Sequence, residues 1–142
     1  MAPFIAVLVF ILLLAVAIAH AVWAFGGSWP IRNKAMLAQT VIGAPGVTAV
    51  PRLAAFGIAI AVTVAGIVAL ALADHTSGRY WLDAIGIALV LVFHSRGAIG
   101  YTRWWQQKTP LEPFRTLDRR NYSPLCLGLG AGFLILVVLR YI

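Results

Sequence analysis

Charged residues are scarce in this chain of 142 residues: Asp, Glu, Lys and Arg together make up 11% of it, and only 4 residues are acidic. A soluble globular domain usually carries about 25% charged residues. The chain has too few charges to cover a surface that faces water, while 62% of its residues are hydrophobic. This scarcity excludes most soluble folds and indicates that the solvent of the protein is a lipid bilayer.

Residues for catalysis are also in short supply. Cys126 is the only cysteine, which excludes an internal disulfide framework and a metal site with several thiolate ligands. Asp74 and Asp83 are expected at one end of the molecule and Glu112 and Asp118 at the other, so paired carboxylates for hydrolysis are missing. The sequence has no phosphate-binding glycine loop, HExxH helix or dinucleotide fingerprint. It therefore leaves open whether the protein is an enzyme.

Long uncharged runs are what the sequence does contain. A helix needs about 20 mostly apolar residues to cross a bilayer, and three runs reach that length: 1–31, 53–73 and 121–139. A fourth run is shorter, but Trp81 before it and Trp104 after it mark the two water interfaces of a helix roughly 35 Å long. We predict an all-α integral membrane four-helix bundle, a single transmembrane domain over residues 1–142. Its helices are expected at about 3–25, 51–73, 80–102 and 123–141.

The two long loops are predicted to carry short helices that lie in the membrane interface. One is expected from Ala35 to Val41. In the other loop, Thr109 and Glu112 have the spacing of a capping box, with Pro110 at the first helical position.

The distribution of positive charge predicts the topology. Nine basic residues fall on the side of the long loops: Arg32, Lys34, Arg52, Arg96, Arg103, Lys108, Arg115, Arg119 and Arg120. Only Arg79 and Arg140 fall on the other side. By the positive-inside rule the long loops are cytoplasmic and both termini lie on the opposite side. Attraction to anionic lipid headgroups accounts for the basic loops, so we expect membrane lipids and no nucleic acid as partners.

Small residues predict how the helices pack. Gly57 with Ala61, and Gly128 with Gly132, have the spacing that lets helix backbones approach closely in lipid. Gly97 and Gly100 thin one face of the third helix. The expected result is a tight bundle.

Polar side chains within the spans are the candidate functional residues. His94 and Arg96 lie inside the third span, where charges are costly and usually face the bundle interior or a water-filled cavity. His20 and Trp23 share a face of the first helix. The candidate ligand-binding residues lie at or near the cytoplasmic half of the bundle: His20, Trp23, His94, Arg96, Tyr101, Arg103, Asp118 and Tyr122.

Three interpretations of these residues compete. His20 and His94 would ligate a haem if they faced each other across an apolar slot. In a lipid or quinone pocket, Arg96 and Arg103 would hold an anion while a histidine transferred protons, which would make the protein a membrane-embedded enzyme. In the structural interpretation, the polar side chains hydrogen-bond one another, backbone carbonyls or Asp118 and thereby fix the bundle.

Two segments carry a resemblance to a known family: His20 to Pro30 after the first helix, and Phe114 to Cys126 entering the fourth. Together they resemble the small bacterial membrane proteins of domain of unknown function 3995. The resemblance covers essentially the whole chain and implies a four-helix protein, which we expect in the bacterial inner membrane, but no reaction. We expect a binding or accessory subunit that packs against other membrane subunits and holds a lipid or cofactor near the cytoplasmic side.

Overall fold

The computed structural model describes residues 1–74 and 80–142, and these residues are helices and connecting loops without β-strands. Arg79, one of the two basic residues expected on the side of the termini, lies outside them. Within the described ranges, four helical stretches are long and apolar enough to cross a membrane. They are α1 (Ala2–Ala24), α3 (Arg52–Leu72), α4 (Tyr80–Ile99) and the continuous stretch formed by α6 (Phe114–Leu117), η1 (Asp118–Tyr122) and α7 (Ser123–Val138). The predicted all-α membrane fold is confirmed.

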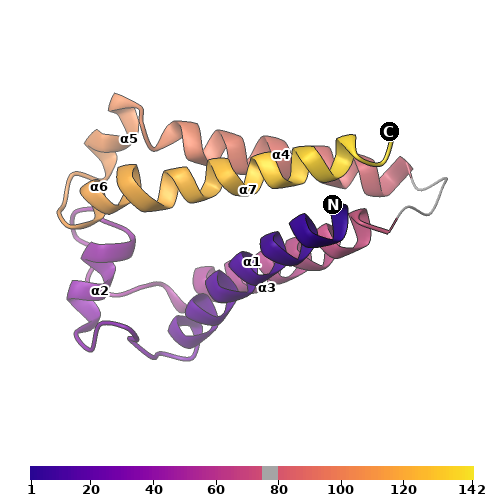
Figure 1. Ribbon diagram of the computed structural model, residues 1–142. Coiled ribbons are helices and arrows are strands. Elements are labelled where there is room, and N and C mark those ends of the chain that lie inside the picture. The colour runs from indigo at the N-terminus through magenta and orange to yellow at the C-terminus, as the bar shows by residue number, and fades with distance from the viewer. Residues whose placement is uncertain (75–79) are drawn as a thin grey trace.

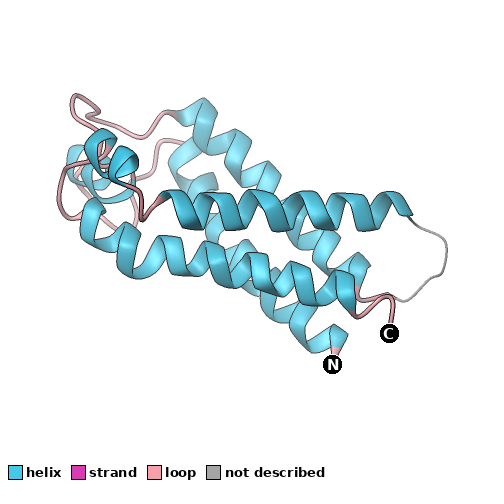
Figure 2. Cartoon of the chain, turned by 90° about the horizontal axis from the view of Figure 1, so that it is seen from above, coloured by secondary structure: helices cyan, strands magenta, loops and turns pink. Residues whose placement is uncertain are grey.

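The long helices form two antiparallel pairs, α1 with α3 and α4 with α7 (Figure 1). Both chain termini lie at one end of the bundle, which we call the termini end. At the other end, the loop end, lie α6 and two further short helices, α2 (Lys34–Val41) and α5 (Arg103–Lys108) (Figures 1 and 2). A single polar assembly can therefore form where the loops converge.

Each long helix buries a narrow stripe and leaves its other faces apolar. On α1 the buried residues recur every three or four positions: Ala2, Ala6, Val9, Leu13 and Ala17. Phe133 of α7 lies at the centre of the core and stacks on Phe93 of α4 with 5.7 Å between ring centroids. Because the outward faces are also apolar, the bundle is suited to lipid on its outside.

Three helix ends differ from their predicted positions by three residues or more. The fourth span ends at Val138 and not near residue 141. The other two ends differ because local polar contacts were not foreseen. The third span ends at Ile99 and not near residue 102, since Thr102 begins α5 by accepting a hydrogen bond from the Trp105 N–H at its side-chain oxygen. The fourth span begins at Phe114, nine residues before its predicted start. Pro124 lies in the first turn of α7, and that turn continues the π-helical turn η1, in which the Ser123 N–H bonds to the carbonyl of Asp118. Proline lacks an N–H and its ring crowds the preceding turn, and the wider π turn accommodates it.

The short loop helices are present, but one cap was predicted wrongly. The helix expected at 35–41 is α2, and the Asn33 side chain caps it. The capping box at Thr109 does not form: the Thr109 hydroxyl donates to the carbonyl of Trp105 and so ends α5. Glu112 accepts the Thr116 N–H, while the following helix begins only at Phe114.

Glycines divide into those that packing requires and those that face outward. A Cβ added to Gly97 would lie 2.6 Å from Leu127 Cγ, and one added to Gly132 would lie 2.6 Å from Val9 Cγ2. The prediction that glycine allows close packing on one face of α4 is therefore confirmed at Gly97. Gly57 and Gly128 have open space where a Cβ would be, so these two do not pack within the bundle as predicted.

Candidate functional site

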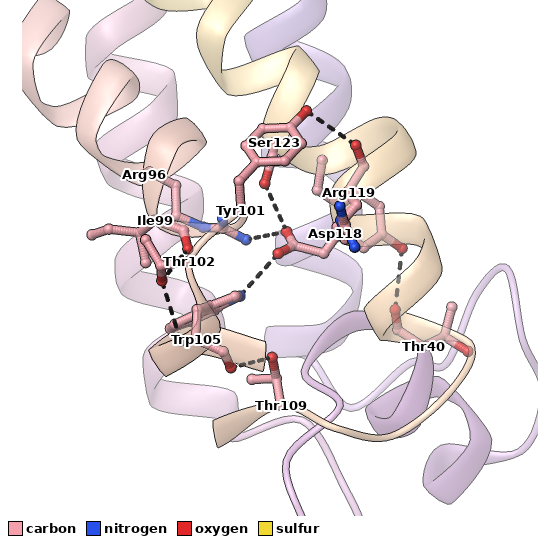
Figure 3. Close-up of polar contacts among 11 residues, drawn as sticks. Thr40, Arg96, Ile99, Tyr101, Thr102, Trp105, Thr109, Asp118, Arg119 and Ser123 are labelled. Atoms are coloured by element: carbon pink, nitrogen blue, oxygen red, sulfur yellow. Dashed lines mark hydrogen bonds and ion pairs between the residues drawn. The ribbon is translucent and has the colours of Figure 1, made fainter. Parts of the chain in front are cut away.

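The loop end is organised around one buried carboxylate, Asp118, which is only 1% exposed. Its Oδ1 accepts a hydrogen bond from Arg96 Nη2 at 2.7 Å, which is also an ion pair, and one from Ser123 Oγ at 3.3 Å. Its Oδ2 accepts from Trp105 Nε1 at 2.9 Å (Figure 3). Both carboxylate oxygens are therefore engaged by side chains of this chain. We call Arg96, Trp105, Asp118 and Ser123 the Asp118 cluster.

The cluster joins three elements that the sequence keeps apart. Arg96 comes from the last turn of α4, Trp105 from α5, and Asp118 from the start of η1. The Arg96 guanidinium carbon lies 5.1 Å from the centre of the Trp105 ring, within cation–π range. Gly100 makes this approach possible, because a Cβ there would collide with the Ser123 hydroxyl and lie 2.8 Å from Asp118 Oδ2.

Arg96 is committed to this cluster. Its side chain is 34% exposed, but the Nη2 side bonds to Asp118 and Trp105 covers the guanidinium. Its Nη1 is buried without a hydrogen-bond partner among the described residues. Charge-assisted hydrogen bonds are stronger than those between neutral groups. The main interaction of Arg96 is therefore the one that neutralises the charge of Asp118.

Each of the two candidate histidines makes a hydrogen bond to a backbone carbonyl of its own helix. His20 Nδ1 lies 2.8 Å from the carbonyl oxygen of Val16, and His94 Nδ1 lies 2.9 Å from that of Val90. A carbonyl only accepts, so in both rings Nδ1 is the donor, and Nε2 is an acceptor in the neutral ring. The His20 ring also packs on Trp23 with 4.7 Å between centroids, which confirms that these two share a face.

The structure does not join the two histidines. His94 lies against Gly130 of α7, where a Cβ would collide with its ring. α1 and α4 make at most minor contact, and no hydrogen bond or ring contact in the described part of the chain links His20 to His94. Across residues 1–74 and 80–142, no group of three or more His, Cys, Asp or Glu side chains is arranged to hold a metal ion.

The candidate tyrosines brace the loop end. The Tyr122 hydroxyl donates to the carbonyl of Thr40 in α2 at 3.2 Å, and its ring lies 5.8 Å from that of Phe114. The Tyr101 hydroxyl donates to the carbonyl of Arg119 at 3.1 Å (Figure 3). Both hydroxyls therefore hold backbone segments in place.

The remaining two candidates, Trp23 and Arg103, have no hydrogen bond to the Asp118 cluster among the described residues. Trp23 Nε1 donates to the carbonyl of Trp29 at 2.7 Å and closes the loop that follows α1. Arg103 is exposed at the start of α5. The eight candidate residues thus do not form one pocket.

A shallow depression of about 470 Å³ opens on the surface of the loop end, close to the cluster. It is lined by Tyr101, Glu112, Arg115, Thr116, Arg119 and Arg120. Only Tyr101 of these had been singled out as a ligand residue.

Two cluster residues, Trp105 and Ser123, escaped sequence reasoning. No polar contact was predicted for either of them, and Gly100 was expected only to thin one face of the third helix. One signal was available, because Thr102 precedes Trp105 by three residues, the spacing of an N-cap. This spacing predicts that a new helix begins after Thr102 and contains Trp105.

A second buried ion pair lies at the termini end. Arg140 pairs with Asp83, and the Tyr141 hydroxyl donates to Asp83 Oδ2 at 2.8 Å. That hydrogen bond is the main reason why the pKa of Tyr141 lies above its usual value of 10.0. Arg140 also donates to the carbonyl of Asp74 at 2.9 Å. The sequence had placed Asp83 at an interface without a partner.

Comparison with known proteins supports the family resemblance and adds no activity. No curated protein and no solved structure matches the chain. A family model described as "Protein of unknown function (DUF3995)" matches residues 13–133, a range that contains the whole Asp118 cluster. The chain therefore belongs to this family of membrane proteins of unknown function.

Proposed function

We propose that the protein is an accessory subunit of a larger complex in the bacterial inner membrane, with its loop end in the cytoplasm and a lipid held there. The observation that carries the accessory role is the pair of small-residue faces that point out of the bundle. Gly57 and Ala61 on α3, and Gly128 and Ala131 on α7, are all exposed, and a Cβ at either glycine meets nothing within 4 Å.

Such faces suit a neighbouring membrane helix. Lipid tails are as apolar as the helices, so association in a bilayer depends on close packing, which small residues permit. In this chain the equivalent residues Gly97 and Gly132 are used to pack its own helices. The outward glycines offer the same contact to a second protein.

The polar residues support an architectural role over catalysis. Arg96, the anion anchor of an enzyme, is engaged by Asp118. His20 and His94 are each tied to a carbonyl of their own helix and packed against separate partners, Trp23 and Gly130. Haem ligation by two histidines needs imidazoles that face each other, and these contacts do not provide that arrangement.

The accessory role is tested by purification at native expression level in a mild detergent, after chemical crosslinking in the membrane. We expect one membrane protein to copurify in fixed ratio with the unaltered chain. The variants Gly57→Ile and Gly128→Ile should weaken this association by about tenfold or more, because a bulky side chain blocks close helix approach.

Ala88→Ile is the matched control, since Ala88 is an exposed small residue on α4, a helix that carries neither of the two glycine faces. It should leave the association unchanged, and circular dichroism should show the same helix content in every variant. A chain that runs as a monomer with no protein in fixed ratio would refute the accessory role.

A further inference from the structure

Hydrogen bonds hold in place the segments that line the depression at the loop end. Tyr101, at the end of α4, reaches it and donates to the carbonyl of Arg119 at 3.1 Å (Figure 3). Glu112 accepts the Thr116 N–H at 3.1 Å and fixes the start of α6. Asp118, next to Arg119, is held by three donors. The lining segments are thus fixed on both sides by hydrogen bonds.

The depression is strongly positive. Arg115, Arg119 and Arg120 are exposed, and no side-chain hydrogen bond or ion pair to another described residue satisfies their guanidinium groups. Glu112 is the one acidic residue in the lining, and one of its oxygens already accepts the Thr116 N–H. Three arginines against one glutamate leave a net formal charge of +2 with unused donors.

Its height along the bundle matches that of lipid headgroups. Arg119 and Arg120 immediately precede the uncharged run that becomes α7. Tyr101 just before α5 and Trp104 within it are exposed, and exposed aromatic residues of this kind gather at the membrane interface. We therefore expect the free guanidinium groups at the depth of the lipid phosphate groups.

We propose that this depression binds the headgroup of an anionic phospholipid, with Arg115, Arg119 and Arg120 contacting its phosphate. Guanidinium groups suit this ligand because their paired N–H groups match the oxygens of a phosphate. The inference rests on the proposed cytoplasmic, lipid-holding loop end and specifies its ligand. It does not require a protein partner.

Native mass spectrometry of the purified chain tests the site. Phosphatidylglycerol and phosphatidylcholine are added separately to the detergent-solubilised protein, and the bound lipid is counted at each concentration. We expect the unaltered chain to prefer phosphatidylglycerol. The triple variant Arg115→Gln, Arg119→Gln, Arg120→Gln should lose that preference by about tenfold or more, since it removes three charges that attract an anionic headgroup.

The matched control is the triple variant Arg32→Gln, Lys34→Gln, Lys108→Gln, which removes the same charge from exposed positions outside the depression. It should keep the preference. An equal loss in both triple variants would show diffuse attraction to the whole loop end and overturn the site, as would no preference in the unaltered chain.

A further arm adds inorganic phosphate in millimolar excess. Displacement of the lipid by phosphate would overturn the lipid as ligand in favour of a soluble phosphate compound. Equal thermal stability of the triple variants and the unaltered chain controls for folding. Because the assay uses the isolated chain, its failure is distinguishable from failure of the accessory role, which is judged by copurification.

Discussion

Asp118 illustrates how a membrane protein keeps a charge inside. A buried carboxylate is costly unless it is paired and its remaining oxygen is also hydrogen-bonded. Arg96 supplies the opposite charge, and Trp105 and Ser123 supply the other donors. Since these donors come from different elements, the carboxylate can be satisfied only when α4, α5 and η1 are all in place.

Asp118→Asn should therefore destabilise the protein although it barely changes the size of the side chain. It removes the negative charge and leaves Arg96 without a counterion. Removing one partner of a buried ion pair costs about 3–5 kcal/mol, and we expect about 2–3 kcal/mol here because Arg96 is 34% exposed and retains access to water. Thermal unfolding in detergent, followed by circular dichroism, measures the loss.

Two further variants give this prediction its control. Arg119→Gln removes an exposed charge next to the cluster and should change stability by less than about 0.5 kcal/mol. In the double variant Arg96→Met, Asp118→Asn, the loss should be smaller than the sum of the two single losses, because both charges are gone. Strict additivity would contradict the pairing.

At this scale the sequence predicted part of the site. Arg96 and Asp118 were paired in one of three interpretations, because a charge inside a span needs a partner. The role of Trp105 was not predictable from hydropathy, since its indole reaches Asp118 only through the turn that Thr102 begins. The histidine contacts follow from helix geometry, as each bonds to the carbonyl four residues before it.

The sequence predicted the central parts of the four spanning helices well and several of their ends poorly. Hydropathy locates the spans because the bilayer demands a length of apolar helix. It says little about where polar flanks continue the helix. Residues 114–122 are too polar to resemble a span, yet α6 and η1 carry the helix through them.

Close packing of α4 on α7 depends on the absence of a side chain at Gly97. Gly97→Ala would place a Cβ 2.6 Å from Leu127 Cγ and 2.9 Å from the backbone oxygen of Ser123. The leucine can rotate, whereas the backbone oxygen cannot. We expect a loss of about 1–3 kcal/mol, the usual cost of overpacking, measured as a lower midpoint of thermal unfolding.

Gly128→Ala is the comparison within the same helix pair, because an added Cβ there meets nothing within 4 Å. In the isolated chain it should be neutral or slightly stabilising, since alanine is the better helix former. If the two alanine variants lost equal stability, the close contacts at Gly97 would not explain the effect, because Gly128 has no such contacts.

For the molecule as a whole, the two helix pairs are braced differently. Asp118 with Arg96 at the loop end, and Asp83 with Arg140 at the termini end, both tie α4 to the chain segments around α7. The α1 and α3 pair has no ion pair among the described residues, and it is tied to the loop end through Tyr122 and Thr40 in the α2 region. The pair of α4 and α7 thus carries both ion pairs, and the basic depression lies at its loop end.

The orientation of this pair in the membrane is the property that the charge distribution predicts most directly. Exposed basic residues gather at the loop end, and positive loops are retained in the cytoplasm. In a Cys126→Ser background, Gln107→Cys places a thiol at the loop end and Ile142→Cys places one at the termini end, both at exposed positions. Neither changes the charge that sets the topology.

The two variants are treated with an impermeant maleimide on bacterial cells whose outer membrane is permeabilised. The thiol at position 142 should be labelled at once and that at position 107 only after lysis. Labelling of position 107 in intact cells would show the opposite orientation. The depression would then lie on the outer side of the membrane, and the proposed cytoplasmic lipid site would be wrong.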